Sequence, residues 1–262
     1  MNIFTQFVKS LYSPKDMATF RFQGIGKTIL YVFFIMLISI IPFSYHFTMM
    51  VNQGVKAMKD TTNEIPAFTI KNGILSSEQN ETKILSKDGM KIVFDPTGNI
   101  TAEDIEKEKD AIGILKDEFI ISSNGNVETL QYSMVEGLNL SKQKLNSYLN
   151  ALDSSLGIFL PIIIFLSYLF VSAMGFIKIT IFASLALLIR QGRKLSYKQS
   201  FRITAYCITL PTVIFTLFSL FKIAIPFGFL INWALIILML YLTIQAMPIP
   251  KKKQSNIEPS VK

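Results

Sequence analysis

Long apolar runs alternate along the chain with short basic segments and one long polar segment. Residues 29–47 carry no charge, and three further apolar runs occupy residues 156–189, 203–221 and 229–247. Because an α-helix rises about 1.5 Å per residue, about 20 apolar residues cross the roughly 30 Å hydrocarbon core of a bilayer. The pattern predicts a membrane protein with an α-helical bundle of about four transmembrane helices, the first over 29–47 and the others within 156–247.

The polar segment between the first two runs, residues 48–155, has the pattern of a water-exposed domain. Alternating stretches such as residues 91–94 indicate strands. Thr101 can cap a short charged helix that reaches Asp110, and residues 138–152 carry leucines at helical spacing. Glycine turns recur at Asn72-Gly73, Asp88-Gly89, Thr97-Gly98 and Asn124-Gly125. We expect a small α+β domain inserted between the first and second transmembrane helices, with residues 91–94 as its central strand.

The N-terminal segment, residues 1–28, predicts a short amphipathic helix. Phe4, Phe7, Val8 and Leu11 follow the i, i+3, i+4, i+7 spacing of one helical face. A basic segment with such a face is expected to lie on the inner membrane surface.

Charge gives the chain an orientation. The net charge of +8 combines basic segments with an acidic one, because residues 48–155 hold 11 lysines and 16 acids, a net charge of −5. Basic residues dominate segment 1–28, loop 190–202 and tail 248–262. By the positive-inside rule these three segments are cytoplasmic and the acidic domain is extracytoplasmic. We expect a multi-pass protein of a bacterial plasma membrane with both termini in the cytoplasm.

The basic side chains of the loop and the tail are expected to fix topology and to contact lipid headgroups, so we expect the lipid bilayer as a partner and no nucleic acid. These side chains are Arg190, Arg193, Lys194, Lys198, Arg202, Lys251, Lys252 and Lys253.

The second apolar run is too long for one simple span. As an unbroken helix, residues 156–189 would extend about 50 Å. The chain must cross an odd number of times between the outer domain and the inner loop. We expect one span over 158–177, with a bend at Gly175 and a helix that continues past Lys178 at the inner surface.

Polar positions within the spans are the candidate membrane site. Lys178 and Lys222 lie near predicted span ends, where a long side chain can reach the headgroups, and Lys222 begins a short outer turn. Thr204, Tyr206, Thr209, Thr212 and Thr216 give the third span a polar face. That face either lines a substrate groove or bonds to neighbouring helices. The predicted spans contain no Asp or Glu, which leaves a carboxylate-based proton pathway without residues.

The sequence offers little for catalysis. With one cysteine, Cys207, and one histidine, His46, it cannot form a His/Cys zinc cluster. A Ser/Lys dyad in the outer domain remains, with Ser133 or Ser141 as nucleophile and Lys142 or Lys144 as base. We expect no enzyme, no catalytic residues, no metal and no cofactor.

Four stretches together resemble a known family: FVKSLYSPKDMATFRFQGIGKTILYVF, IPAFTIKNGIL, MKIVFDPTGNI and LLIRQGRKLSYKQSFRIT. They are similar to the DUF1189 membrane proteins of Gram-positive bacteria, some of which carry a maltodextrin-utilisation label. The resemblance implies a plasma-membrane protein with an extracytoplasmic domain and supplies no catalytic residues. The loop 190–202 lacks the motif by which sugar-importer permeases dock their ATPase.

Two functions are consistent with these features. The first is a non-enzymatic accessory or sensory protein whose outer domain recognises a protein partner or an envelope ligand. The alternative is a transporter or importer component for a small solute.

Overall fold

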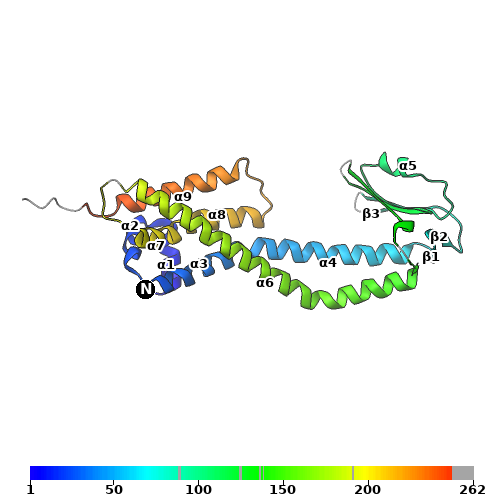
Figure 1. The fold of residues 1–262 in the computed structure, drawn as a ribbon, viewed down its shortest axis with the longest axis horizontal. Helices are drawn as coiled ribbons and strands as arrows, with labels where there is room; N and C mark the ends of the chain where they lie inside the picture. The colour runs from blue at the N-terminus through cyan, green and yellow to red at the C-terminus, as the bar shows by residue number, and fades with distance from the viewer. Residues whose placement is uncertain (88–89, 124–125, 136, 138, 191, 250–262) are drawn as a thin grey trace, which may run out of the picture. The chain divides into compact units, whose positions relative to one another are not determined.

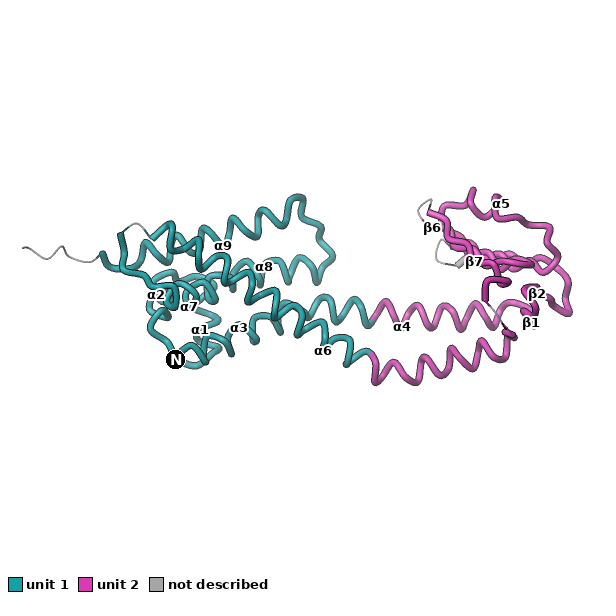
Figure 2. The backbone as a smooth tube through the Cα atoms, viewed as in Figure 1, with its two compact units in different colours: residues 1–48, 160–262 teal, residues 49–159 magenta. Residues whose placement is uncertain are grey.

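The computed structural model describes residues 1–87, 90–123, 126–135, 137, 139–190 and 192–249. The chain divides into two compact units (Figure 2). Unit 1 comprises Met1–Thr48 and Leu160–Lys262, and unit 2 comprises Met49–Phe159. Unit 1 is helical, whereas unit 2 holds all the described strands (Figure 1).

The described helices include four that are long and apolar enough to cross a membrane, as the hydropathy pattern predicts. In chain order the helices are α1 (Ile3–Tyr12), α2 (Pro14–Thr19), η1 (Phe20–Phe22), α3 (Ile25–Ser39), α4 (Ile41–Glu64), α5 (Ala102–Glu106), η2 (Tyr132–Met134), α6 (Lys142–Leu188), α7 (Tyr197–Cys207), α8 (Thr209–Leu220) and α9 (Gly228–Gln245). The four candidate spans are α3 with α4, α6, α7 with α8, and α9.

Proline explains the two places where a candidate span is interrupted. The helix breaks at Ile40 and resumes as α4, whose second residue is Pro42. The third candidate span is interrupted in the same way: α7 ends before Ile208 and the helix resumes as α8, whose third residue is Pro211. Proline has no amide proton to donate, so it fits the first turn of a helix, where no intrahelical acceptor is available.

Helix α6 continues as a helix through Gly175. Glycine at position 175 allows Met36 to pack closely against α6, because a Cβ there would lie 2.7 Å from the Met36 sulfur. The segment before Lys178 exposes ten large apolar side chains, which are Ile158, Phe159, Ile162, Ile163, Phe165, Leu166, Leu169, Phe170, Met174 and Ile177. After Lys178 the helix turns Ile179 and Phe182 into the core of unit 1.

Helix α1 packs with its polar side inward. Gln6 is 3% exposed and Ser10 is fully buried, whereas Phe4 is 64% and Val8 is 50% exposed. A helix of a water-soluble protein shows the opposite arrangement. The outward apolar side is what a helix on a membrane surface requires.

Unit 2 contains two sheets in its described part. The strands are β1 (Phe68–Lys71), β2 (Ile74–Ser77), β3 (Lys83–Lys87), β4 (Met90–Phe94), β5 (Asp110–Ile114), β6 (Glu118–Ser123), β7 (Asn126–Gln131) and β8 (Asn139–Ser141). One sheet has the order β2-β1-β8 and the other β3-β4-β5-β6-β7, in which only β4 and β5 are parallel.

The central strand of the larger sheet is β5, not residues 91–94 as predicted. The helix that was expected to reach Asp110 ends at Glu106 and keeps the predicted Thr101 cap. The sequence of strand β5 shows no period-two pattern, because Ala111 and Gly113 on one face and Ile112 and Ile114 on the other are all non-polar, although their burial alternates. Two of the predicted turns, at residues 88–89 and 124–125, lie outside the described residues.

The two faces of the larger sheet have different covers. Helix α5 lies over one face (Figure 1), where Ile105 packs among Val93, Ala111, Leu115 and Ile120. The smaller sheet covers part of the other face, as the following core residues show: Phe68, Ile70, Leu75, Phe94 and Tyr132. The inserted region is therefore an α+β domain with its own core.

Two helical segments form the base of unit 2. Residues 49–64 of α4 and 142–159 of α6 are joined by an ion pair of 2.7 Å between Lys59 and Asp153. Lys142 donates to the carbonyl of Ile65 at 2.6 Å and so closes the carbonyl end of α4.

Candidate functional site

A buried polar cluster joins the N-terminal segment to α7. The Tyr206 hydroxyl donates to Gln23 Oε1 at 2.9 Å and lies 3.2 Å from Gln6 Oε1. The Gln6 amide donates to Gln23 Oε1 at 3.1 Å. Tyr206 also stacks on Tyr31 at 4.2 Å, and the Tyr31 hydroxyl bonds to Thr209 at 2.6 Å. Each buried polar group is thus matched by another, which is how such groups avoid a desolvation penalty.

Removing the Tyr206 hydroxyl tests this cluster. Tyr206→Phe leaves the buried Gln6 oxygen without its donor and leaves Gln23 Oε1 with only the Gln6 amide, so we expect a loss of about 1–2 kcal/mol of stability. The measurement is the thermal midpoint of the purified full chain in detergent. Tyr241→Phe is the matched control, because Tyr241 is 42% exposed. Equal midpoints for the two variants would contradict a stabilising role.

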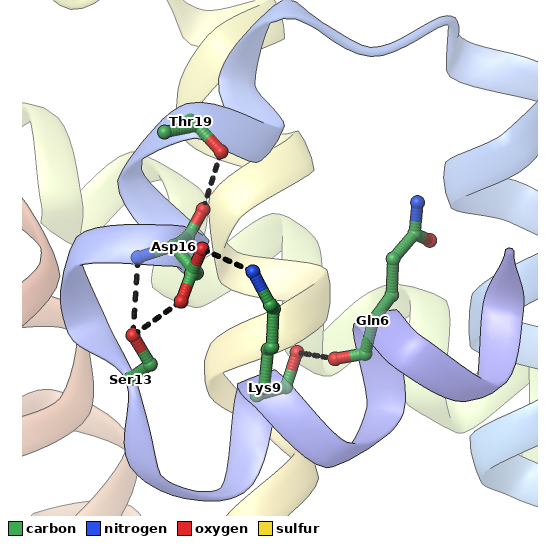
Figure 3. Close-up of polar contacts among 6 residues, drawn as sticks. Gln6, Lys9, Ser13, Asp16 and Thr19 are labelled. Carbon is green, nitrogen blue, oxygen red and sulfur yellow. Dashed lines mark hydrogen bonds and ion pairs between the residues drawn. The ribbon is translucent and has the colours of Figure 1, made fainter. Parts of the chain in front are cut away.

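The corner between α1 and α2 holds the N-terminal segment in place (Figure 3). Ser13 caps α2 by accepting from the Asp16 amide, and Lys9 pairs with the Asp16 carboxylate at 2.7 Å. The hydrogen bond from Lys9, followed by that from Ser13, lowers the pKa of Asp16 below its usual value. The start of α2 at Ser13-Pro14 follows from the proline preference for the first helical turn.

The threonine face of the third span is turned partly into the core. Thr204 and Thr209 are fully buried, and Thr204 donates to the Ser200 carbonyl at 2.8 Å. Thr212 and Thr216 are half-buried. In Thr204 and Thr209 the hydroxyls bond within the helix bundle, which corresponds to the packing interpretation of this face.

The arginines of the loop 190–202 are bound to backbone carbonyls. Arg193 is 8% exposed and donates to the carbonyls of Met247 and Gln245, both at 3.2 Å, beyond the last turn of α9. Arg202 donates to the Arg21 carbonyl at 3.0 Å, and Arg190 to the Leu195 carbonyl at 3.1 Å. The exposed lysines are Lys194 and Lys198, and the tail lysines Lys251, Lys252 and Lys253 lie outside the described residues. Arg193 and Arg202 thus bind carbonyls at helix ends, and Arg190 ties the loop to itself, in addition to any effect on topology.

A shallow cavity of about 600 Å³, widely open on one side, lies beside α6, α8 and α9. It is lined by Lys178, Phe215, Phe218, Ser219, Lys222, Ile223, Ala224, Ile225, Gly228, Phe229 and Asn232. The sequence places Lys178 near an inner span end and Lys222 in an outer turn. The structure brings both side chains to one cavity, so they do not lie at opposite ends of a span.

The stretch FDPTGN of unit 2 forms a tight turn around one carboxylate. Asp95 is fully buried and accepts from the amides of Thr97 at 3.1 Å and Ile100 at 2.8 Å. Thr82 donates to the same carboxylate at 2.7 Å. Burial acts to raise the pKa of Asp95, but the hydrogen bonds outweigh it and hold the pKa below its ordinary value. This turn is a structural anchor between β4 and the α5 segment.

The lysines considered for catalysis are engaged elsewhere. Lys142 donates to the carbonyls of Asn63 and Ile65, and Lys144 donates to that of Asn139 at 2.9 Å. Within the described residues, no group of three or more His, Cys, Asp or Glu side chains is placed to hold a metal ion.

Comparison with family models gives one match, to a protein family of unknown function named DUF1189, over residues 4–244. The chain belongs to the DUF1189 family. No curated protein and no solved structure matches it. Family membership alone therefore assigns this DUF1189 protein no activity, and its chemistry has to be argued from its own side chains.

Sequence reasoning missed the most connected polar residues of this DUF1189 protein. Gln6 and Ser10 lie one turn apart on the side of α1 opposite Phe4 and Val8, which is a signal that the polar side was the packed one. The partner Tyr206 lies on the predicted polar face of the third span, whereas Gln23 gave no comparable signal. The pairing of Lys178 with Lys222 depends on how α6 packs against a later hairpin, which spacing along the chain does not encode.

Proposed function

We propose that this protein is a non-enzymatic accessory or sensory protein of the bacterial plasma membrane, with its termini and its basic loop in the cytoplasm and unit 2 outside. The four candidate spans and the segregation of charge support the topology. The outward apolar side of α1 supports contact with the inner membrane surface.

One observation carries the recognition role, which is a pair of exposed apolar side chains on the larger sheet of unit 2. Ile121 is 38% and Leu130 is 47% exposed, and both lie on the face opposite α5. They end two adjacent apolar cross-strand rows, one through Leu85, Ile92 and Ile112 and the other through Phe94, Ile114 and Phe119. The smaller sheet covers the far part of these rows, where Leu85 and Phe94 pack in its core.

Such a surface is suited to a protein partner. Exposed apolar groups that lie together on an otherwise polar domain mark interaction sites more often than isolated ones do. The cross-strand neighbour of Ile121 is the acid Glu128, and residues 48–155 carry a net charge of −5. We therefore propose a partner with an apolar centre and a basic rim.

The packing of unit 1 gives less support to the alternative of a transporter or importer component. The hydroxyls of Thr204 and Thr209 are bonded inside the bundle, and neither residue lines the cavity described above. A link to maltodextrin utilisation belongs to this proposal only through the label that some family members carry.

A photoreactive amino acid at Leu130 of the full-length chain, in native membranes, tests the recognition role. We expect one crosslinked partner, and we expect Ile121→Glu to reduce that crosslink about tenfold, because a buried charge removes the apolar contact. The control is the same probe at Thr129, which lies next to Leu130 on the opposite face of the sheet.

A crosslink that survives Ile121→Glu, or that forms equally well from Thr129, would contradict recognition through this face. Thr129→Glu adds the same charge to the other face and is expected to leave the Leu130 crosslink intact.

A further inference from the structure

The cavity beside α6, α8 and α9 is positively charged and has no acidic lining residue. Lys178 is half-buried and Lys222 is exposed. Among the described residues, neither ammonium group has a hydrogen bond or an ion pair, whereas Lys9, Lys59 and Lys91 each have a carboxylate partner. Two unpaired cations beside one cavity repel each other unless an anion lies between them.

The backbone of the α8–α9 turn adds to the positive character of the cavity. Gly228, the first residue of α9, lines its wall, and the preceding Phe227 provides no side-chain cap. The N-terminal end of an 18-residue helix carries a partial positive charge and amide protons directed along the helix axis. Asn232, one turn further along α9, lines the same cavity with its amide.

Lys222 occupies a position where glycine is normally found. Its amide donates to the Ser219 carbonyl and the amide of Ile223 donates to Phe218, which is the Schellman pattern at a helix end. The residue at this position takes a left-handed conformation, and Lys222 has a φ of 55°. A lysine here costs stability that a glycine would not. Strained backbone of this kind is concentrated at binding sites, which is consistent with a ligand for the Lys222 ammonium group.

Apolar groups complete the cavity and its surroundings. Phe215 and Phe218 line one wall, and Phe229 lines another while remaining 66% exposed. Phe221 is 69% and Phe227 is 79% exposed at the same turn. A ligand that meets two ammonium groups and this many aromatic rings has an anionic head and a hydrophobic tail.

We propose that this cavity binds the phosphate headgroup of an anionic phospholipid, with Lys178 and Lys222 as its cationic contacts and the phenylalanines against its acyl chains. The proposal uses the insertion of unit 1 in the membrane but not the partner recognition by unit 2. The two proposals therefore fail independently.

Native mass spectrometry of the full-length chain in a neutral detergent tests this site. The probes are phosphatidylglycerol and phosphatidylcholine with the same acyl chains, added at equal concentration. We expect the chain to retain phosphatidylglycerol preferentially, and the double variant Lys178→Gln, Lys222→Gln to reduce that preference by roughly thirtyfold, on the usual strength of two lysine–lipid contacts.

Two further double variants separate the site from general charge. Lys178→Arg with Lys222→Arg keeps both cations and is expected to keep the preference. Lys71→Gln with Lys109→Gln removes two exposed lysines of unit 2 and is also expected to keep it. An unchanged preference in the Lys178, Lys222 glutamine variant would overturn the proposal. Displacement of the lipid by inorganic phosphate would overturn the lipid assignment in favour of a soluble phosphate.

Lys222→Gly keeps the test decisive if the double variant fails to fold. Glycine is the preferred residue at this left-handed position, so this variant should unfold at the same or a higher temperature than the natural chain. We expect it to lose about fivefold in phosphatidylglycerol preference, the share of one lysine. A stable Lys222→Gly chain with full lipid preference would also overturn the proposal.

Discussion

Replacing Asp95 with asparagine is expected to destabilise unit 2 by about 2–3 kcal/mol with almost no change in side-chain volume. The two carboxylate oxygens accept from Thr82, from Thr97 and from the amide of Ile100. An asparagine has one acceptor oxygen and one NH2 donor group. The NH2 group would therefore face a donor that one carboxylate oxygen of Asp95 now accepts from, and that donor would lose its acceptor. Hydrogen exchange of the full chain, followed in peptides from β4 to β6, measures the loss of protection.

The same carboxylate predicts a dependence on pH with a definite sign. The pKa of Asp95 lies below its ordinary value of 3.8, so the folded state favours the charged form. Its stabilising effect is complete above pH 3.8 and is lost as the pH falls through the lowered pKa. We expect the exchange protection of β4–β6 in the natural chain to decrease on acidification. In Asp95→Asn this protection should decrease less, because the titrating carboxylate is absent.

A matched control separates this turn from general charge effects. Asp117→Asn removes one exposed carboxylate from the same unit and is expected to leave exchange in β4–β6 unchanged. Equal exchange in Asp95→Asn and Asp117→Asn would show that the buried hydrogen bonds contribute nothing measurable.

Replacing Arg193 with alanine is expected to cost unit 1 about 3 kcal/mol. The side chain donates to the carbonyls of Met247 and Gln245 and, at 2.6 Å, to the Gln245 side chain. Without it these buried carbonyls lose a charged donor. The thermal midpoint of the purified chain should fall by roughly 5–10 °C.

Lys194→Ala is the control, because it removes the same charge from the next residue, which is exposed. A role limited to topology predicts similar effects from the two variants and an altered orientation of the ends of the chain. We expect only Arg193→Ala to lower the thermal midpoint, with the orientation of a terminal reporter unchanged in both. Equal midpoints would refute the role of Arg193 in closing α9.

The predicted part of the fold is the part with a local signal. Hydropathy alone gave the four long helices, and alternation between turns gave β4 and its neighbours. Strand β5 was missed because Ala111–Ile114 is non-polar on both faces and so shows no alternation, with Gly113 leaving room for Ile105 on the α5 side. Strand β8 has only three residues and exists through its pairing with β1, far away in the sequence.

The candidate sites were harder to predict, since they depend on packing between distant elements. Lys178 and Thr209 were recognised as polar residues in apolar runs, but their neighbours come from elsewhere in the chain, Lys222 from the α8–α9 turn and Tyr31 from α3. The arginines of the loop 190–202 illustrate the same limit. Their charge was evident from composition, whereas their backbone acceptors at Met247 and Arg21 follow only from the tertiary fold.

The pairing of β1 with β8 has a consequence for the order of folding. During synthesis, Thr69 of β1 cannot pair with β8 until Ser141 has been added to the chain, roughly 70 residues later. At synthesis rates of about 5–20 residues per second this delay lasts roughly 4–14 seconds. The larger sheet can form during that interval from segments close in sequence, whereas one edge of β1 stays open. The interval is thus the period in which a chaperone at the membrane would protect the nascent chain from aggregation through that edge.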